Sequence, residues 1–401
     1  MSDPCLLTIA EAAALIRKRR LSPLELTEAH LARIDRLDRT LGSYITVSRD
    51  LAIRQAREAT DQLARNRPSS PLFGIPISLK DNIATAGVRT TAASRVLEDW
   101  IPEADATVVT RLRAAGAITL GKANMSEFAF AGGRGANEFL EPPKNPWGLA
   151  YSSGGSSNGS AVNVAAGLAM ASIGTDSGGS IRIPAAFCGI SGLTPTFGRV
   201  GRTGCIPFSH SMGSAGPLSR TVEDLALVLE AIAGFDPGDR TSSRQPVPRY
   251  SQALRRRVEK LRIGTCEHYV KAVGVQADVA AAMKAFLDVL RAIGLPPPTD
   301  VTIPHLAYSS AAGYNTIMRV EAFHNHFRRM QTHRAKYGHA FRNIARGGFL
   351  TTYDYLRAQQ ARALIVDEVR AAFERIDVLV LPVTPATPDG GEYLTEGDDE
   401  K

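Results

Sequence analysis

The sequence predicts an α/β protein, in which helices alternate with the strands of a β-sheet. Apolar residues switch between helical spacing in residues 22–34 and the period of two typical of strands in residues 75–80. The 401 residues are 44% hydrophobic and 22% charged, which is a globular composition at a length that suggests two or three domains. No apolar run reaches the length of a membrane span, so we expect none.

The elements of the N-terminal half follow from their end signals. Ser22 and Glu25 have capping-box spacing, and Pro23 suits the first helical position, so a helix is expected to begin there. A short strand is predicted over residues 75–80, ending at Lys80. A helix near residues 108–112 and a strand over residues 117–120 continue the alternation.

The C-terminal half continues the pattern after an exposed connection, which the Pro, Gly, Ser and Arg residues of 234–250 predict. A strand is expected over residues 261–263, and the fully apolar run 378–381 predicts a central strand. Between them a helix stopped by Gly294 carries an apolar stripe. The stripe consists of Val279, Met283, Phe286, Leu287, Leu290 and Ile293.

Charge and cysteine usage exclude several classes of protein. The chain has 47 basic and 40 acidic residues, but no aromatic residues interleave with the basic runs 17–20 and 255–257, so we expect no nucleic-acid partner. The cysteines are scattered without C-x-x-C spacing, and residues 1–10 lack the pattern of a secretory signal. We therefore expect a cytoplasmic protein with reduced thiols and no zinc site. The thiols are Cys5, Cys188, Cys205 and Cys266.

Residues 145–198 differ from the rest of the chain. Asp176 and Arg182 are the only charged residues there, where average composition would give roughly a dozen. The stretch is instead dense in Gly and Ser, as in SSGGSSNGS (152–160) and GTDSGGS (174–180). Because residues 161–171 form too apolar a helix for a linker, the window predicts a buried, loop-rich site.

Three kinds of chemistry compete for this window. Phosphate binding is disfavoured because neither cluster fits a P-loop or a dinucleotide fingerprint. A nucleophile elbow at Ser157 matches G-x-S-x-G, but no apolar strand precedes it. The third is a serine nucleophile, Ser180, on a Gly-rich turn whose N–H groups converge, with buried Lys80 as its base. His324 and His326 could suggest a metal, but we expect both to face solvent from a helical stretch.

The motifs then favour the third possibility, because they closely resemble the amidase signature. Residues 174–189 read GTDSGGSIRIPAAFCG, after the GGSS of residues 154–157. The strand GIPISLKD (74–81), GKANMSEF (121–128), NPW (145–147) and GPLSRTVED (216–224) are similar to further landmarks of that family. The resemblance spans residues 6–388.

The resemblance implies a Ser-cisSer-Lys triad that hydrolyses a small-molecule amide through an acyl-enzyme, without metal or cofactor. Ser180 is then the nucleophile, Ser156 the bridging serine after a cis peptide bond, and Lys80 the base. The oxyanion would be held by the N–H groups of Ser177, Gly178, Gly179 and Ser180. We expect Asp176 and Arg182 to support the loop, by pairing or by hydrogen-bonding the surrounding backbone. Ser157 is expected to order the relay through hydrogen bonds, and Met125 either lines the acyl pocket, by analogy with the family, or packs in the core.

The resemblance also implies one large domain, with a mixed, mostly parallel sheet covered by helices on both faces. We expect this domain over residues 1–388, without the family's usual C-terminal end, and a flexible acidic tail over residues 389–401. Residues 211–213 (SMG) also depart from the family's Ser-Leu-Asp.

Two further functions stay open: a truncated, catalytically impaired homologue, and the glutaminase subunit of a tRNA-dependent amidotransferase. Residues 321–326 do not resemble that glutaminase, which ranks it lower. A homodimer is compatible with either function.

Overall fold

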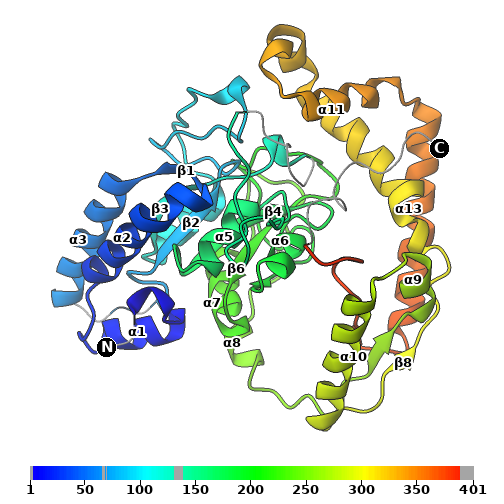
Figure 1. The fold of residues 1–401 in the computed structure, drawn as a ribbon, viewed down its shortest axis with the longest axis horizontal. Coiled ribbons are helices and arrows are strands. Elements are labelled where there is room, and N and C mark those ends of the chain that lie inside the picture. The colour runs from blue at the N-terminus through cyan, green and yellow to red at the C-terminus, as the bar shows by residue number, and fades with distance from the viewer. Residues whose placement is uncertain (1–2, 66–67, 69, 131–138, 389–401) are drawn as a thin grey trace. The chain divides into compact units, whose positions relative to one another are not determined.

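The computed structural model describes residues 3–65, 68, 70–130 and 139–388 (Figure 1). The chain divides into two compact units, each described separately below. The first takes in Met1–Leu254 and Arg329–Arg342, and the second Arg255–Arg328 and Asn343–Asp389. The predicted tail over residues 389–401 lies outside the described residues, and the predicted domain boundary stays a prediction. None of the described helices is long and apolar enough to cross a membrane.

The first unit is built on a six-stranded sheet with the order β1-β3-β2-β4-β6-β5. Strands β3, β2 and β4 are parallel at its centre, whereas the pairs β1–β3, β4–β6 and β6–β5 are antiparallel. Because β5 runs opposite to β6, four of the six strands share one direction. The predicted mixed sheet is therefore confirmed. Its strands are β1 (Tyr44–Val47), β2 (Pro76–Lys80), β3 (Ile118–Ala123), β4 (Ala171–Asp176), β5 (Ser191–Gly192) and β6 (Ser214–Ser219).

Helices cover both faces of this sheet (Figure 1). One core packs α1, α4 and α7 against Ile77, Leu79 and Ile173. The other packs α2, α3 and α5 against Ile118, Leu120 and Leu218. The helices are α1 (Ile9–Arg17), α2 (Pro23–Leu41), α3 (Arg49–Arg65), α4 (Thr107–Ala114), α5 (Asn158–Ala165), α6 (Arg182–Phe187), α7 (Val222–Ile232), α8 (Tyr250–Ala253) and α12 (His339–Arg342).

Local signals set several of these elements as expected. The Ser22 and Glu25 capping box begins α2, and β2 ends at Lys80.

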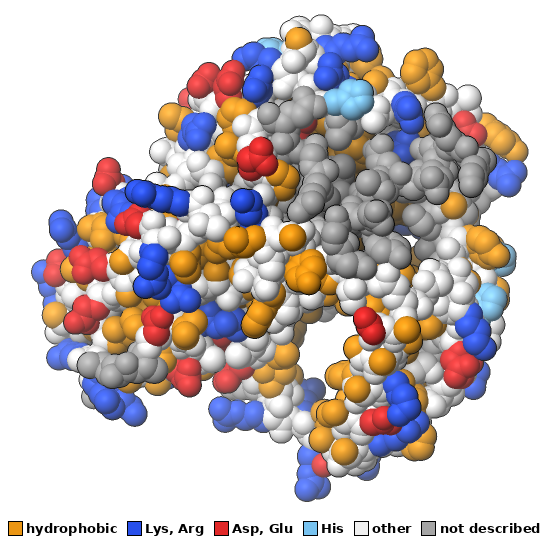
Figure 2. Space-filling model, viewed as in Figure 1, with side chains coloured by type: hydrophobic (Ala, Val, Ile, Leu, Met, Phe, Trp, Pro, Cys, Tyr) orange, Lys and Arg blue, Asp and Glu red, His pale blue; other side chains and the backbone are white. Residues whose placement is uncertain are grey.

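On the face shown in Figure 2, basic and acidic side chains are interspersed over α2 and α3 rather than separated by sign. The surface over these two helices therefore shows no broad basic face.

The second unit contains a three-stranded parallel sheet with the order β8-β7-β9. A small core of Cys266, Val301, Ile303, Ala372 and Ile376 lies beside it. The elements are β7 (Ile263–Thr265), α9 (Glu267–Ala272), α10 (Ala277–Ala292), β8 (Thr299–Asp300), α11 (Asn315–His333), α13 (Thr352–Phe373) and β9 (Val378–Leu379), with α11 ending in the first unit.

Two expectations for the C-terminal half need correction. Residues 378–381 do not form a central strand, because β9 is short and pairs only with β7 within the described residues. His326 is buried in α11, and only His324 of the pair is exposed. The expected helix before Gly294 is present as α10, and on its apolar stripe the Phe286 and Ile293 side chains are 50% and 58% exposed. The sequence thus predicted these elements but not their neighbours.

Small polar side chains line the sheet face from which Lys80 projects. Ser78 and Ser172 share that face because side chains alternate along a strand, and Leu79 points to the opposite core. Ser78 Oγ donates to Ser172 Oγ at 2.9 Å and accepts from Asn163 Nδ2 of α5 at 3.2 Å. This small face lets α5 approach the sheet closely.

Gly159 tests this close approach. In Gly159→Ala the new Cβ would lie 2.5 Å from Ser43 O and closer still to Asn124 O. We expect a loss of about 1–3 kcal/mol in the free energy of unfolding, measured by urea denaturation. Gly313→Ala is the control, because its Cβ would come no nearer than 3.3 Å to Ala358 O. A Gly159→Ala protein as stable as wild type would contradict the packing.

Candidate active site

The Gly/Ser loops meet at one edge of the central sheet. β2 and β4 are parallel neighbours, so their C-terminal ends, Lys80 and Asp176, lie at the same edge. Residues 152–157 lead into α5 there, and residues 177–181 connect β4 to α6. Ser157 N donates to Ser180 O at 3.1 Å and joins the two loops. The structure thus gathers the predicted site residues of both motifs.

Lys80 is fully buried at the centre of this site. Its Nζ donates to Ser156 Oγ at 2.7 Å and to Thr175 O at 3.1 Å. Burial lowers the Lys80 pKa to about 7, although the negative charge of Asp176 opposes this shift. The peptide bond between Gly155 and Ser156 is cis, as the resemblance implied. The arrangement supplies a lysine that can be neutral near pH 7 in contact with a serine hydroxyl.

Ser157 lies between the two Gly/Ser loops. Its side chain is buried, and its Oγ donates to Thr175 O at 3.2 Å, the carbonyl that also accepts from Lys80. Gly174 lies directly beneath it, where a Cβ would come 2.9 Å from Ser157 Oγ. Ser157 therefore packs between the loops and shares an acceptor with the lysine.

Asp176 organises the loop that carries Ser180. Its carboxylate accepts from Gly179 N at 2.6 Å and Ile181 N at 3.0 Å. Arg182 donates to the same carboxylate through Nε at 3.0 Å and Nη2 at 3.1 Å, so the expected pair is present. Burial alone would raise the Asp176 pKa, but Arg182 and the two N–H groups hold it at about 2.

One of the four predicted oxyanion donors has a partner within the loop. The N–H of Gly179 donates to the Asp176 carboxylate, at the point where the loop turns with a φ of +122°. A Cβ at this position would meet Ile183 Cδ1 at 2.7 Å, so the turn requires glycine. Ser177 and Ser180 are partly exposed and Gly178 is exposed. The oxyanion role of the N–H groups in this loop stays a prediction.

Met125 follows β3, and its side chain is buried. The next residue, Ser126, donates its N–H to Ser156 O at 3.2 Å, so the segment lies against the bridging serine. The described residues include no group of three His, Cys, Asp or Glu side chains suited to a metal ion.

Sequence reasoning assigned no role to several residues that the structure places around the site. Thr194 Oγ1 donates to Asp176 at 2.8 Å, and Asn82 Nδ2 donates to Thr175 Oγ1 at 3.0 Å. Lys122 lies buried beside Asp81. Asp81 follows Lys80 directly, and Lys122 is the second residue of the quoted motif GKANMSEF (121–128), so a charged residue inside an apolar strand was the available signal.

Burial of Lys80 has a measurable cost in stability. With its pKa near 7 in the folded state and an ordinary value of 10.5, the lysine destabilises the fold as pH falls from 10.5 to 7. Lys80→Met should therefore raise the free energy of unfolding at pH 7, on the order of 2–4 kcal/mol after its hydrogen bonds are lost. Urea denaturation at pH 7 and pH 10.5 measures this, and the gain should shrink at the higher pH. A variant less stable than wild type at pH 7 would contradict it.

Comparison with known proteins identifies the family of this chain. The chain matches the Amidase family over residues 25–400. The A subunit of the glutamyl-tRNA(Gln) amidotransferase of Methylococcus capsulatus is 42% identical over 402 residues, covering 94% of this chain and 82% of that protein. Its counterpart of the same name from an Anaeromyxobacter species is 43% identical over 414 residues, covering 96% and 84%.

Solved structures lead to the same family. A structure described as a vestigial protein complex that reveals the origins of an s-triazine catabolic enzyme has a TM-score of 0.88 at 33% identity, covering 95% of this chain and 82% of that one. The native peptide amidase of Stenotrophomonas maltophilia has a TM-score of 0.81 at 31% identity, covering 97% and 87%. This chain therefore belongs to the amidase family and has the fold of the amidase signature enzymes.

Proposed function

We propose that this protein is an amidase that hydrolyses the C–N bond of a small-molecule amide, with Ser180 as nucleophile. One observation carries the proposal: fully buried Lys80, with a pKa near 7, donates to Ser156 Oγ at 2.7 Å. A lysine that can lose its proton near neutral pH can act as the base of a serine hydrolase. Ser157, whose backbone N–H is bonded to Ser180 O, keeps the two serine loops together.

The proposed reaction is a relay of two proton transfers among three side chains. Neutral Lys80 accepts a proton from Ser156 Oγ, Ser156 accepts one from Ser180 Oγ, and Ser180 Oγ forms a bond to the amide carbonyl carbon. When the tetrahedral intermediate collapses, the C–N bond breaks and the proton returns through Ser156 to the leaving nitrogen. Water then attacks the acyl-enzyme by the same route, which releases the acid and restores Ser180.

The loop after β4 would stabilise the negative charge that develops on the carbonyl oxygen. The N–H groups of Ser177, Gly178 and Ser180 are the proposed donors, and the Asp176–Arg182 pair holds the loop that carries them. Met125, beside the Ser126–Ser156 contact, is the proposed wall of the acyl pocket. Linear amides, carbamates and acylureas all contain the required carbonyl and nitrogen.

We also propose a reducing, cytoplasmic setting, which four unpaired cysteines support.

Labelling with a fluorophosphonate probe tests the nucleophile. Intact-mass analysis should find one adduct, and peptide mapping should place it on Ser180. Ser180→Ala should lose the adduct, and Lys80→Ala should slow labelling by about 10²-fold or more, since the base contributes about that factor. Ser22→Ala is the control for the loss of a serine hydroxyl, because Ser22 caps α2 beside Gly74, at the opposite end of β2 from Lys80.

Each other outcome of the labelling experiment has a definite meaning. An adduct on Ser157 would replace the proposed nucleophile with the elbow serine. A folded protein that takes no label would contradict the amidase proposal and favour the impaired homologue.

The pH dependence of labelling tests the base. Because the pKa of Lys80 is lowered to about 7, the neutral base is lost as pH falls below that value. The labelling rate should fall about tenfold per pH unit below pH 7 and level off above it. Rates measured from pH 5.5 to 9 on protein shown to be folded decide the point. A rate independent of pH over this range would exclude Lys80 as the titrating base.

A second candidate function is glutaminase activity, which the names of two similar relatives favour. Both relatives described above are amidotransferase A subunits. In that case the substrate is the side-chain amide of glutamine, and the chemistry at Ser180 is unchanged. Ammonia release from glutamine, compared with a panel of small amides and with Ser180→Ala as blank, separates the two. Release from glutamine alone would favour the second candidate.

A further inference from the structure

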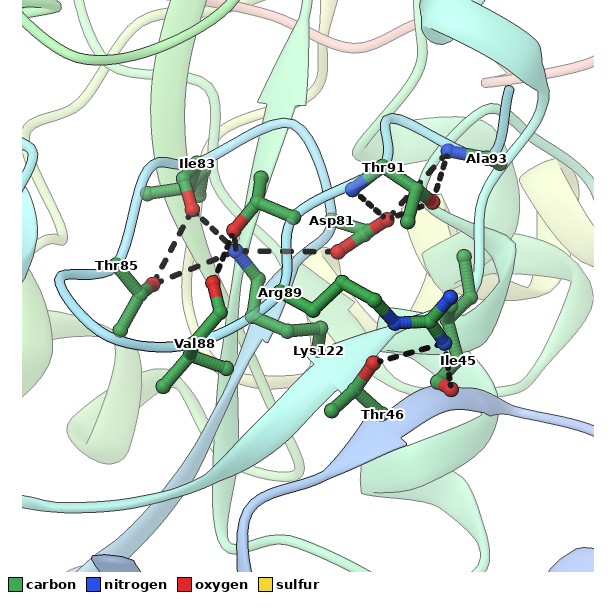
Figure 3. A network of polar contacts seen from close by, with 11 residues as sticks. Ile45, Thr46, Asp81, Ile83, Thr85, Val88, Arg89, Thr91, Ala93 and Lys122 are labelled. Atoms are coloured by element: carbon green, nitrogen blue, oxygen red, sulfur yellow. Dashed lines mark hydrogen bonds and ion pairs between the residues drawn. The ribbon is translucent and has the colours of Figure 1, made fainter. Parts of the chain in front are cut away.

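The proposed reaction leaves a second buried lysine unused. Lys122 of β3 is fully buried, and its Nζ donates to Ile83 O, to Thr90 Oγ1 at 2.8 Å and to Thr85 Oγ1 at 3.3 Å. It lies 3.9 Å from Asp81 Oδ1, and Figure 3 shows the lysine nitrogen at the centre of these contacts. A buried charge with this many partners holds together the strand and the loop that surround it.

The two lysines project from opposite faces of the sheet. In the register of β2 and β3, Lys122 pairs with Leu79, and Lys80 pairs with Ala123. Because register partners point to the same face and side chains alternate along a strand, Lys122 lies on the face of Leu79 and Lys80 on the other. Asp81 N donates to Ala123 O at 3.1 Å and extends this pairing by one residue. Lys122 is thus placed to act on the catalytic face through the backbone.

Asp81 closes the loop that follows Lys80. Its Oδ2 accepts from Thr91 N at 2.8 Å and Thr91 Oγ1 at 2.6 Å (Figure 3). Its backbone O accepts from Ala92 N at 3.1 Å. Ala92 and Ala93 have φ values of +50° and +54°, which alanine disfavours. The carboxylate therefore stabilises a turn that these residues would not adopt unaided.

This turn leads to the other partner of the catalytic hydrogen bond. Ala92 O accepts from Phe128 N at 2.9 Å, and two residues earlier Ser126 N donates to Ser156 O at 3.2 Å. Asp81 is joined to Lys80 by a peptide bond. The Asp81–Lys122 cluster is consequently connected to both Lys80 and Ser156.

We propose that Asp81 and Lys122 are positioning residues that fix Lys80 and Ser156 at hydrogen-bond distance. The inference rests on the proposed function, because it assigns these residues to the same proton relay. Removal of either charge should loosen residues 81–93 and slow the relay, although neither side chain touches it.

The test measures fluorophosphonate labelling of Ser180 in Asp81→Asn and Lys122→Met, per folded molecule. We expect the rate to fall about 10²-fold, the size of effect that a misplacement near 1 Å produces. The pH midpoint of labelling should also rise, because water admitted near Lys80 weakens the burial that lowers the Lys80 pKa. Asp176 and Cys205, the two groups that raise this pKa, are unchanged in both variants. A purely structural role would lower the folded fraction without moving this midpoint.

Asp224→Asn is the matched control. Asp224 is a buried carboxylate of α7 that accepts from Ile9 N at 3.0 Å, at the start of α1. We expect it to lose stability and to label with wild-type rate and midpoint. If Asp81→Asn and Lys122→Met also label like wild type, the positioning role is overturned and the amidase proposal stands.

Two further measurements keep the inference testable. If Asp81→Asn and Lys122→Met do not fold, Thr90→Val replaces them, because it removes one hydrogen-bond acceptor of Lys122. Thr90→Val should also slow the labelling of Ser180. An unchanged labelling rate would overturn the positioning role. If the wild-type protein takes no label, the proposed function fails by itself. The crystal structure of Asp81→Asn then decides: a Lys80 Nζ to Ser156 Oγ distance beyond 3.5 Å supports positioning, and an unchanged 2.7 Å overturns it.

Discussion

The hydrogen bond between Lys80 and Ser156 depends on the exclusion of water from one edge of the central sheet. Ser78 and Ser172 are small enough for α5 to pack over that face, and this packing removes water from the lysine. Without solvent the ammonium is poorly stabilised, so the proton is held loosely. The fold tolerates such a group because large apolar cores on both faces of the sheet offset its cost.

Two opposing effects set the proton affinity of this lysine. Burial lowers the Lys80 pKa, and the carboxylate of Asp176 raises it again. Asp176 is itself kept ionised by Arg182 and by the N–H groups of its loop. The same carboxylate therefore shapes the loop that carries Ser180 and limits how far the lysine shifts. Geometry and electrostatics of the site are coupled through one side chain.

The sequence allowed prediction of features that are local or periodic. The capping box at Ser22, the strand ending at Lys80 and the Asp176–Arg182 pair are of this kind. The roles of Asp81 and Lys122 were not predictable, because they depend on a register shift between β2 and β3 and on a long loop returning to β2. Composition alone likewise indicates burial for residues 378–381 but cannot give the number of neighbouring strands.

Gly179 shows how this geometry restricts variation of the gene. Its φ is positive, and a Cβ would collide with Ile183, while its N–H is held by Asp176. Every amino acid reachable from a glycine codon by one base change carries a Cβ, so a single mutation at this codon either ends the chain, leaves glycine unchanged or strains the loop. Diversification of substrate range in descendants of this protein must then begin at other positions, where the backbone tolerates a side chain.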